Sequence, residues 1–213
     1  SNFLFINMGN KTISGIPVPY FEEQSKQFGL DDNSDSNHAS FFDYDRDGDL
    51  DLFILNHKIG FKDSAKFRLK EQKDGSMKRI KTPETPFESN RLYRNDGGRF
   101  TDVTAIAGLV SSAFGLSATP VDIDRDGWLD IYVANDFIEP DNVYFNNRDG
   151  TFTDHFFDYF KHTSHFSMGT DATDFNNDGL VDIIVVDMKS GDHVRYKELA
   201  NPMQYDKYNL MVQ

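Results

Sequence analysis

The chain of 213 residues is long enough for a substantial core, with 38% hydrophobic and 14% aromatic residues. Its 35 acidic residues outnumber its 22 lysines and arginines, for a net charge of −13. We therefore expect no nucleic-acid partner and no anionic membrane partner, since both need a basic face. No cysteine is present, which excludes disulfides, thiolate metal sites and cysteine catalysis. No apolar run approaches the roughly 18 residues of a membrane span, so we expect no membrane insertion.

The chain begins with short apolar segments separated by turn residues. The first covers residues 4–7, and the second starts at Phe21. A third precedes an acidic stretch at residues 43–51, and an apolar run follows it at 52–55. Apolar runs of about four residues between turns favour buried strands over helices. Because the chain opens within a strand-like segment, we expect it to be part of a longer, exported protein.

The acidic stretch recurs along the chain with the pattern D-x-[DN]-x-D-G-x-[LV]-D. Its copies occupy residues 43–51, 122–130 and 174–182. A phenylalanine lies 22 residues before the first Asp of each copy, at Phe21, Phe100 and Phe152. Upstream of each phenylalanine a short segment ends in asparagine, at residues 4–7, 92–95 and 143–146. These shared offsets predict a repeating structural unit.

One unit holds four strands: A before the acidic loop, B after it, C ending in asparagine, and D beginning at the phenylalanine. Four short strands and a period near 52 residues, the spacing from Asp122 to Asp174, are typical of a propeller blade. We predict an all-β fold, a single partial β-propeller of four-stranded antiparallel blades. The predicted division is 1–37 for strands C and D of one blade, 38–110 for a blade, 111–162 for a second blade, and 163–213 for strands A and B of a further blade plus a connection. The remaining blades of the parent protein would be partners of this segment.

A basic insertion at residues 58–81 lengthens the first complete unit. It holds nine lysines and arginines and only three acidic residues. Its position between strands B and C predicts a surface loop. It is either a solvated loop or a docking loop for an acidic partner.

The acidic loops have the composition of calcium sites. Calcium takes six to eight oxygen ligands at roughly 2.3–2.6 Å. Acids at positions 1, 3 and 5 supply carboxylates, Gly at position 6 allows the turn, the backbone carbonyl at position 7 adds an oxygen, and Asp at position 9 can close the shell. The alternative is a set of solvated acidic turns.

We predict about three Ca²⁺ ions and one ligand set in each loop. The candidate ligands are Asp43, Asp45, Asp47, Asp49 and Asp51 in loop one, Asp122, Asp124, Asp126, Trp128 and Asp130 in loop two, and Asp174, Asn176, Asp178, Leu180 and Asp182 in loop three. An EF-hand is excluded because its position 12 needs Glu, whereas here that position is Ile54, Val133 or Val185.

The loops and the strands after them resemble the FG-GAP/VCBS repeats of integrin-α-like propellers. The segments at residues 38–43, 132–136 and 192–196 are similar to those of secreted bacterial VCBS proteins that precede an ASPIC/UnbV domain and are related to cartilage acidic protein. The resemblance implies a seven-bladed-type propeller. It also implies calcium in the A–B loops on one face and ligand contacts on the opposite face.

Other candidate chemistry is weaker. No zinc-binding motif joins the histidines, which are His38, His57, His155, His162, His165 and His193. The sequence holds no nucleophile elbow, phosphate loop or dinucleotide fingerprint, so we expect no enzyme activity. Each B strand ends in a pair of residues, the pairs being Asn56-His57, Asn135-Asp136 and Asp187-Met188. These pairs either cap the strands or form a ligand-facing rim, which Glu139 and Asp141 would extend.

We predict a calcium-binding module that binds a protein or carbohydrate ligand at the face opposite the calcium loops. The alternatives are a scaffold propeller of a polysaccharide-degrading enzyme and a structural spacer that calcium stiffens. Weak calcium loops fill only where free calcium is near millimolar. We therefore expect an extracellular or cell-envelope location, in the periplasm or on the outer surface.

Overall fold

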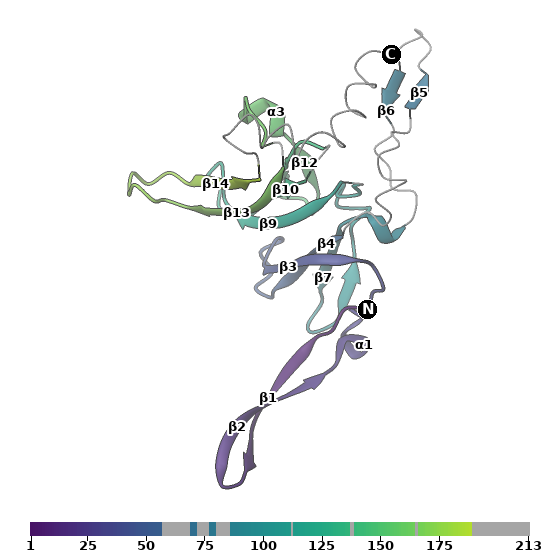
Figure 1. Ribbon diagram of the computed structural model, residues 1–213, viewed down its shortest axis with the longest axis vertical. Coiled ribbons are helices and arrows are strands. Elements are labelled where there is room, and N and C mark those ends of the chain that lie inside the picture. Colours follow the sequence, from purple (N-terminus) through teal and green to yellow (C-terminus); the bar gives the residue numbers. More distant parts are fainter. Residues whose placement is uncertain are drawn as a thin grey trace.

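A computed structural model describes residues 1–56, 69–71, 77–79, 86–111, 113–136, 139–164 and 166–188 of the chain (Figure 1). These residues form short antiparallel strands joined by turns, which confirms the predicted all-β class. Between the strands lie single helical turns, namely α1 (Ser25–Phe28), the 3-10 turn η1 (Pro86–Glu88) and α3 (Phe156–Tyr159).

Two four-stranded antiparallel sheets form the centre of the molecule, as predicted. The first has the order β3 (Ser36–Phe42), β4 (Asp51–Asn56), β7 (Arg91–Asn95) and β8 (Phe100–Asp102). The second has the order β9 (Gly115–Val121), β10 (Asp130–Asn135), β11 (Asn142–Asn146) and β12 (Phe152–Asp154). Each acidic loop therefore joins the first strand of its sheet to the second.

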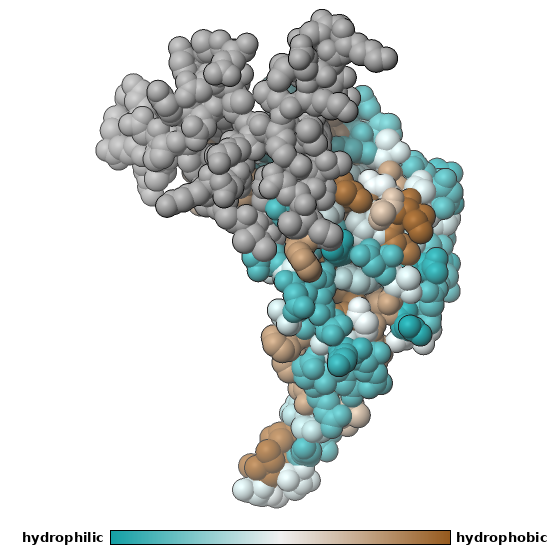
Figure 2. Space-filling view, turned by 90° about the vertical axis from the view of Figure 1, so that its right-hand side faces the viewer, coloured by the Kyte–Doolittle hydropathy of each residue, from teal (hydrophilic) through white to brown (hydrophobic). Residues whose placement is uncertain are grey.

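A two-stranded sheet lies at each end of this centre (Figure 1). The N-terminal pair is β1 (Phe5–Ile13) with β2 (Ile16–Glu23), and the C-terminal pair is β13 (Ser167–Thr173) with β14 (Asp182–Asp187). The first strand is longer than the predicted segment at 4–7, because β1 and β2 continue past a bulge into a long hairpin. Apolar surface covers the tip of this hairpin, at the lower end of Figure 2, where Ile13 and Ile16 are 60% and 63% exposed.

The basic insertion contains a further strand pair, β5 (Leu69–Glu71) with β6 (Met77–Arg79). The sequence predicts only a loop there, so this short hairpin is an addition. The rest of the insertion and the connection predicted after residue 188 lie outside the described residues.

Strand pairing keeps the same register in every unit. Between strands A and B, the ninth residue of each acidic loop pairs with the last residue of strand A, the pairs being Phe42 with Asp51, Val121 with Asp130 and Thr173 with Asp182. Between strands C and D, the terminal asparagine pairs with the phenylalanine, the pairs being Asn7 with Phe21, Asn95 with Phe100 and Asn146 with Phe152. The two end sheets are therefore built like the two halves of a four-stranded sheet.

The first strands of successive sheets, β3, β9 and β13, lie side by side (Figure 1). Hydroxyl groups join them: Ser40 Oγ donates to the Ala118 carbonyl at 3.1 Å, and Thr119 Oγ1 donates to the Thr170 carbonyl at 3.2 Å. These side chains occupy equivalent positions in their repeats. The same contact thus connects each sheet to the next.

The main core lies between the two four-stranded sheets. Phe53, Leu55 and Leu92 of the first sheet pack with Ile131 and Val133 of the second, and all five are fully buried. A central strand covered on both faces needs apolar residues throughout, rather than at alternate positions. This explains the continuous apolar runs that follow the acidic loops.

A tight turn after strand D connects neighbouring sheets at their outer edge. Gly108 has φ +77°, and a Cβ on it would lie 3.1 Å from the Phe152 carbonyl oxygen; Gly29 has φ +79° and the same spacing from the Phe100 carbonyl oxygen. The Phe152 amide also donates to the Ala107 carbonyl at 2.9 Å. Glycine is required here by both the left-handed backbone and the close approach.

Candidate metal centre

The acidic loops adopt one conformation. Their fourth residues all have left-handed backbones, with φ of 60°, 61° and 62° at Arg46, Arg125 and Asn177. The glycine two residues later also has positive φ, with 94°, 88° and 84° at Gly48, Gly127 and Gly179. The amide of that glycine donates to the carboxylate at position 1, at Asp43 (3.2 Å), Asp122 (2.9 Å) and Asp174 (2.8 Å). The repeated sequence therefore produces a repeated turn.

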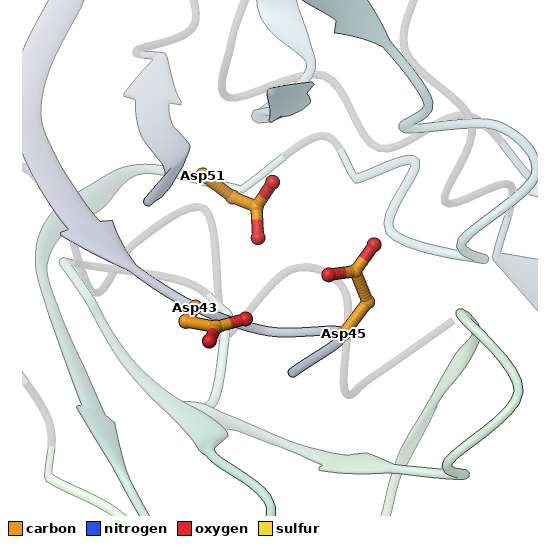
Figure 3. A group of neighbouring side chains, drawn as sticks. All are labelled: Asp43, Asp45 and Asp51. Atoms are coloured by element: carbon orange, nitrogen blue, oxygen red, sulfur yellow. The ribbon is translucent and has the colours of Figure 1, made fainter. Parts of the chain in front are cut away.

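In loop one, the carboxylates of Asp43, Asp45 and Asp51 converge (Figure 3). One oxygen from each lies within 4.8 Å of the others. Asp43 and Asp45 each keep a buried oxygen, Oδ1, that accepts no hydrogen bond. Buried polar atoms are nearly always satisfied, so these oxygens point to a missing partner. A cation among the three carboxylates would supply it.

Loop two repeats this arrangement. Asp122, Asp124 and Asp130 bring one oxygen each within the same 4.8 Å. Asp126, the fifth-position acid, lies outside the trio and binds Arg148, with Nη2 and Oδ2 2.6 Å apart. Burial raises the pKa of Asp126. The hydrogen bonds from the Trp128 amide and the Arg148 guanidinium outweigh burial and keep this pKa below its usual value. The predicted ligand at this position is therefore paired with an arginine.

The ninth-position acids have a role that the sequence analysis missed. Asp51 and Asp130 are buried beneath strand C, and each uses both oxygens to accept backbone amides. Asp51 accepts from Tyr44 at 3.0 Å and Asn95 at 2.9 Å. Asp130 accepts from Ile123 at 3.0 Å and Asn146 at 2.9 Å. Each carboxylate thus ties its loop to the last residue of strand C, and the recurring asparagine at that position was the available signal.

Burial also changes the acidity of this centre. It raises the pKa of Asp51 and of Asp130 to about 6, although the two amide bonds to each carboxylate oppose the rise. The pKa of Asp45 is raised by burial and then by the charges of Asp47 and Asp43. Like charges at this spacing disfavour full ionisation, and a bound cation would relieve the repulsion.

Loop three differs from the other two. The described residues form no acidic trio there, because Asn176 stands at position 3 and donates from Nδ2 to Asp178 Oδ2 at 3.1 Å. Asp182 accepts the Phe175 amide at 3.2 Å, and among the described residues the sheet of β14 holds no strand C to offer a second amide. Phe175 and Leu180 are 74% and 46% exposed. This loop is the most open of the set.

The seventh-position residues lie at the edge of the loops. The Asp49 amide donates to Asp47 Oδ1 at 3.0 Å, and the Asp49 carboxylate accepts the Gly97 amide at 3.1 Å. The amides of Trp128 and Leu180 donate to the fifth-position acids at 2.7 and 2.8 Å. That the backbone carbonyls of the seventh-position residues bind calcium stays a prediction.

The asparagines that end β4 and β10 donate to backbone carbonyls. Asn56 is buried and donates to the Ser89 carbonyl at 2.7 Å, and Asn135 donates to the Pro140 carbonyl at 2.7 Å. Asp141 is 1% exposed and accepts from the Tyr132 hydroxyl at 2.8 Å and the Ser167 hydroxyl at 2.7 Å. The alternative in which Asp141 extends a ligand-facing rim does not fit, since its carboxylate is buried within the fold.

The remaining candidates are scattered. Burial lowers the pKa of His38, and His155 lies 2.7 Å from the Asp158 carboxylate. His57, His165 and His193 lie outside the described residues. Glu139, Asn142 and Asp154 line a cavity of about 200 Å³. No helix among the described residues is long and apolar enough to cross a membrane.

Comparison with known families agrees with this geometry. A family model described as an FG-GAP-like repeat matches residues 84–133 and 122–185, which include the second and third acidic loops. No curated protein matches the chain. FG-GAP repeats are typical of extracellular proteins and form propeller-like modules. Residues 84–185 are therefore similar to FG-GAP-like repeats, which supports that part of the resemblance seen in the sequence.

Proposed function

We propose that this chain is a calcium-binding segment of an extracellular propeller that binds a protein or glycan partner and has no catalytic role. One observation carries the proposal. Three carboxylates converge in loop one, and two of them hold buried oxygens without a hydrogen-bond partner. Leaving such groups unpaired costs about 1–3 kcal/mol each, or more when charged.

Calcium fits this donor set better than other common cations. The donors are carboxylate oxygens on a turn, without sulfur or imidazole, which suits a hard ion with flexible coordination. Asp43, Asp45 and Asp51 would hold the ion in loop one, and Asp122, Asp124 and Asp130 would hold it in loop two. A bound ion would supply positive charge and link the start of each loop to strand C.

The partner surface belongs at the opposite end of the sheets from the acidic loops. Antiparallel pairing places the A–B loops at one end, and the cavity lined by Glu139, Asn142 and Asp154 lies where β11 begins and β12 ends, at the other. Acidic and amide groups there suit a ligand rich in hydroxyl or amino groups. The narrower resemblance to secreted proteins with an ASPIC/UnbV domain stays a prediction.

Calcium binding is tested by thermal unfolding of the metal-stripped chain with added CaCl₂ or MgCl₂. We expect calcium to raise the melting temperature at millimolar concentration and magnesium to raise it less. Asp45→Asn should remove part of the calcium effect, whereas Asp31→Asn, at an exposed acid outside the loops, should leave it intact. Equal melting curves with and without calcium would show that the loops are acidic turns.

The partner role is tested separately on glycan and protein arrays. We expect a ligand whose binding weakens in Glu139→Gln or Asn142→Ala but survives in Asp45→Asn at saturating calcium. A chain that binds calcium but retains no array ligand would instead be a spacer that calcium stiffens.

A further inference from the structure

A chain of hydrogen bonds joins the candidate calcium sites of loops one and two. In loop one, the Tyr44 amide donates to the Asp51 carboxylate at 3.0 Å. The Tyr44 carbonyl accepts from Asn146 Nδ2 at 2.8 Å. The Asn146 amide in turn donates to the Asp130 carboxylate of loop two at 2.9 Å. Two residues therefore connect a candidate ligand of one site to a candidate ligand of the other.

We propose that loops one and two bind calcium cooperatively and that Asn146 is the positioning residue that couples them. An ion bound at one loop fixes the ninth-position carboxylate of that loop, and the hydrogen-bonded chain then orders the other loop. The second loop loses less conformational freedom when it binds, so its affinity for calcium is higher. The proposal rests on the calcium binding proposed above and adds how the two sites act together.

Asn146 suits this role because hydrogen bonds fix its side chain in one orientation. It ends β11 and is 6% exposed. Besides the bond to Tyr44, its Nδ2 donates to the Leu129 carbonyl at 3.3 Å, and its Oδ1 accepts the Arg148 amide at 2.9 Å. Both groups of the side-chain amide are thus bonded. A buried polar side chain whose groups are all bonded makes its surroundings rigid.

Tyr44 is anchored in the second sheet although it belongs to loop one. Its side chain is 3% exposed, and its ring centroid lies 5.9 Å from that of Phe152 on β12. In the sequence, Tyr44 stands directly between the candidate ligands Asp43 and Asp45. A shift of the second sheet at this point therefore moves the backbone that carries the loop-one carboxylates.

A second contact joins the same two loops at the surface. Arg46, at position 4 of loop one, lies over the ring of Trp128, at position 7 of loop two, with Cζ 5.6 Å from the ring centroid. A guanidinium over a tryptophan ring is attracted by the electrons of the ring. The two loops thus contact each other both within the core and at the surface, which favours a joint response to calcium.

Repulsion between two bound ions works against this coupling. Between exposed charges, such repulsion is screened beyond about 8 Å at about 0.15 M salt. The hydrogen-bonded chain is buried, since all four of its residues are at most 6% exposed, so solvent weakens it much less. We therefore expect each site to tighten the other about fivefold, near the lower end of the range for coupled sites.

The first test measures binding at loop two when loop one is intact and when it is unable to bind. The chain holds one tryptophan, Trp128 in loop two, so energy transfer from this residue to bound Tb³⁺ reports that site, and added CaCl₂ displaces the Tb³⁺. Asp43→Asn combined with Asp45→Asn, the loop-one double variant, removes two candidate ligands. We expect it to weaken calcium binding at loop two about fivefold. An unchanged affinity at loop two would overturn the proposal.

Asn146→Ala separates the hydrogen-bonded chain from the two charges that the double variant also removes. In the Asn146→Ala background, the double variant should leave the loop-two affinity nearly unchanged, because the coupling is already lost. The matched control is Asn95→Ala, at the equivalent position of the first sheet, which leaves the bond from Asn146 to Tyr44 in place. The fivefold effect should persist in that background. A fivefold effect that persists in Asn146→Ala, or disappears in both backgrounds, would overturn the role of Asn146.

A further measurement keeps Asn146 in place, since its replacement also removes buried hydrogen bonds that stabilise the fold. In the loop-one double variant, added calcium fills loop two while loop one stays empty. We expect hydrogen exchange of the Tyr44 amide to slow on this addition, because the ordered second sheet holds Tyr44 more firmly. Exchange at Tyr44 that does not respond to calcium would contradict the coupling in a chain with all of its connecting residues.

These outcomes distinguish the coupling from the calcium function on which it rests. A chain in which calcium displaces no Tb³⁺ from loop two fails as a calcium-binding module, and the coupling fails with it. A chain in which calcium fills loops one and two independently keeps the calcium function and overturns only the coupling.

Discussion

Strands β10 and β14 follow nearly identical loops but have different environments. All six residues of β10 are buried, whereas β14 has three exposed residues and no buried one. Both runs are apolar, as Asp130–Asn135 and Asp182–Asp187 show in the printed sequence. The difference arises because β10 has sheets on both faces and strands on both edges, whereas within the described part of the chain β14 has a neighbour on one face and one edge. Burial in this fold therefore depends on the neighbouring sheet, not on the strand's own composition.

The largest expected effect is on stability, when a buried strand residue and its exposed equivalent are each truncated. Phe53→Ala removes a fully buried ring between the two four-stranded sheets and should lower the free energy of unfolding by about 3–5 kcal/mol. Ile184→Ala at the equivalent exposed position should cost less than about 1 kcal/mol. Urea unfolding of the two variants and of the unchanged chain measures both losses. Similar losses would show that β14 is packed in solution.

Calcium should bind more tightly to loops one and two than to loop three. Loops one and two should each stabilise the fold by roughly 2.7 kcal/mol when calcium exceeds the dissociation constant 100-fold. Loop three, with Asn176 and an open edge, should be the weakest site and the first to empty. Calorimetry during calcium titration tests this ranking. Asn176→Asp should strengthen the last site, and an unchanged titration would contradict the charge argument.

Two glycines with left-handed backbones differ in their surroundings. Gly108→Ala should destabilise the fold by about 2 kcal/mol, because the added Cβ meets both backbone strain and the Phe152 carbonyl 3.1 Å away. Gly150→Ala, with φ +85° and open space around it, should cost about 1 kcal/mol from the backbone alone. Thermal unfolding of both variants separates the two contributions. Equal losses would mean that the Phe152 carbonyl moves away from the added Cβ at little cost in free energy.

The smallest expected effect is on pH dependence. Burial raises the pKa of Asp51 and Asp130 to about 6, so their protonated forms stabilise the metal-free fold at low pH. That stability is lost as pH rises from about 4, the unfolded value, to about 6. Calcium requires both groups ionised, so its effect on the melting temperature should be full near pH 7.5 and shrink below pH 6. A calcium effect that is constant from pH 7.5 to 5 would contradict this.

The repeated strands, their register and the acidic turns could be predicted from the sequence because they depend on local features. The positive φ of Gly48, Gly127 and Gly179 and the short apolar runs depend on a few neighbouring residues, and the 22-residue spacing from each phenylalanine to the next loop recurs in the sequence itself. The all-β class and the four-stranded sheets followed from these features alone.

Tertiary structure decided what each side chain contacts. Asp51 and Asp130 lie beneath strand C because amides 44 and 16 residues further along the chain meet their carboxylates. Asp141 is buried rather than part of a rim because Tyr132 and Ser167 close over it from two sheets. Pairing between distant segments has no period in the sequence, since it depends on how successive sheets stack. Phe53 is buried by this stacking, whereas Ile184 at the equivalent position of β14 is 63% exposed.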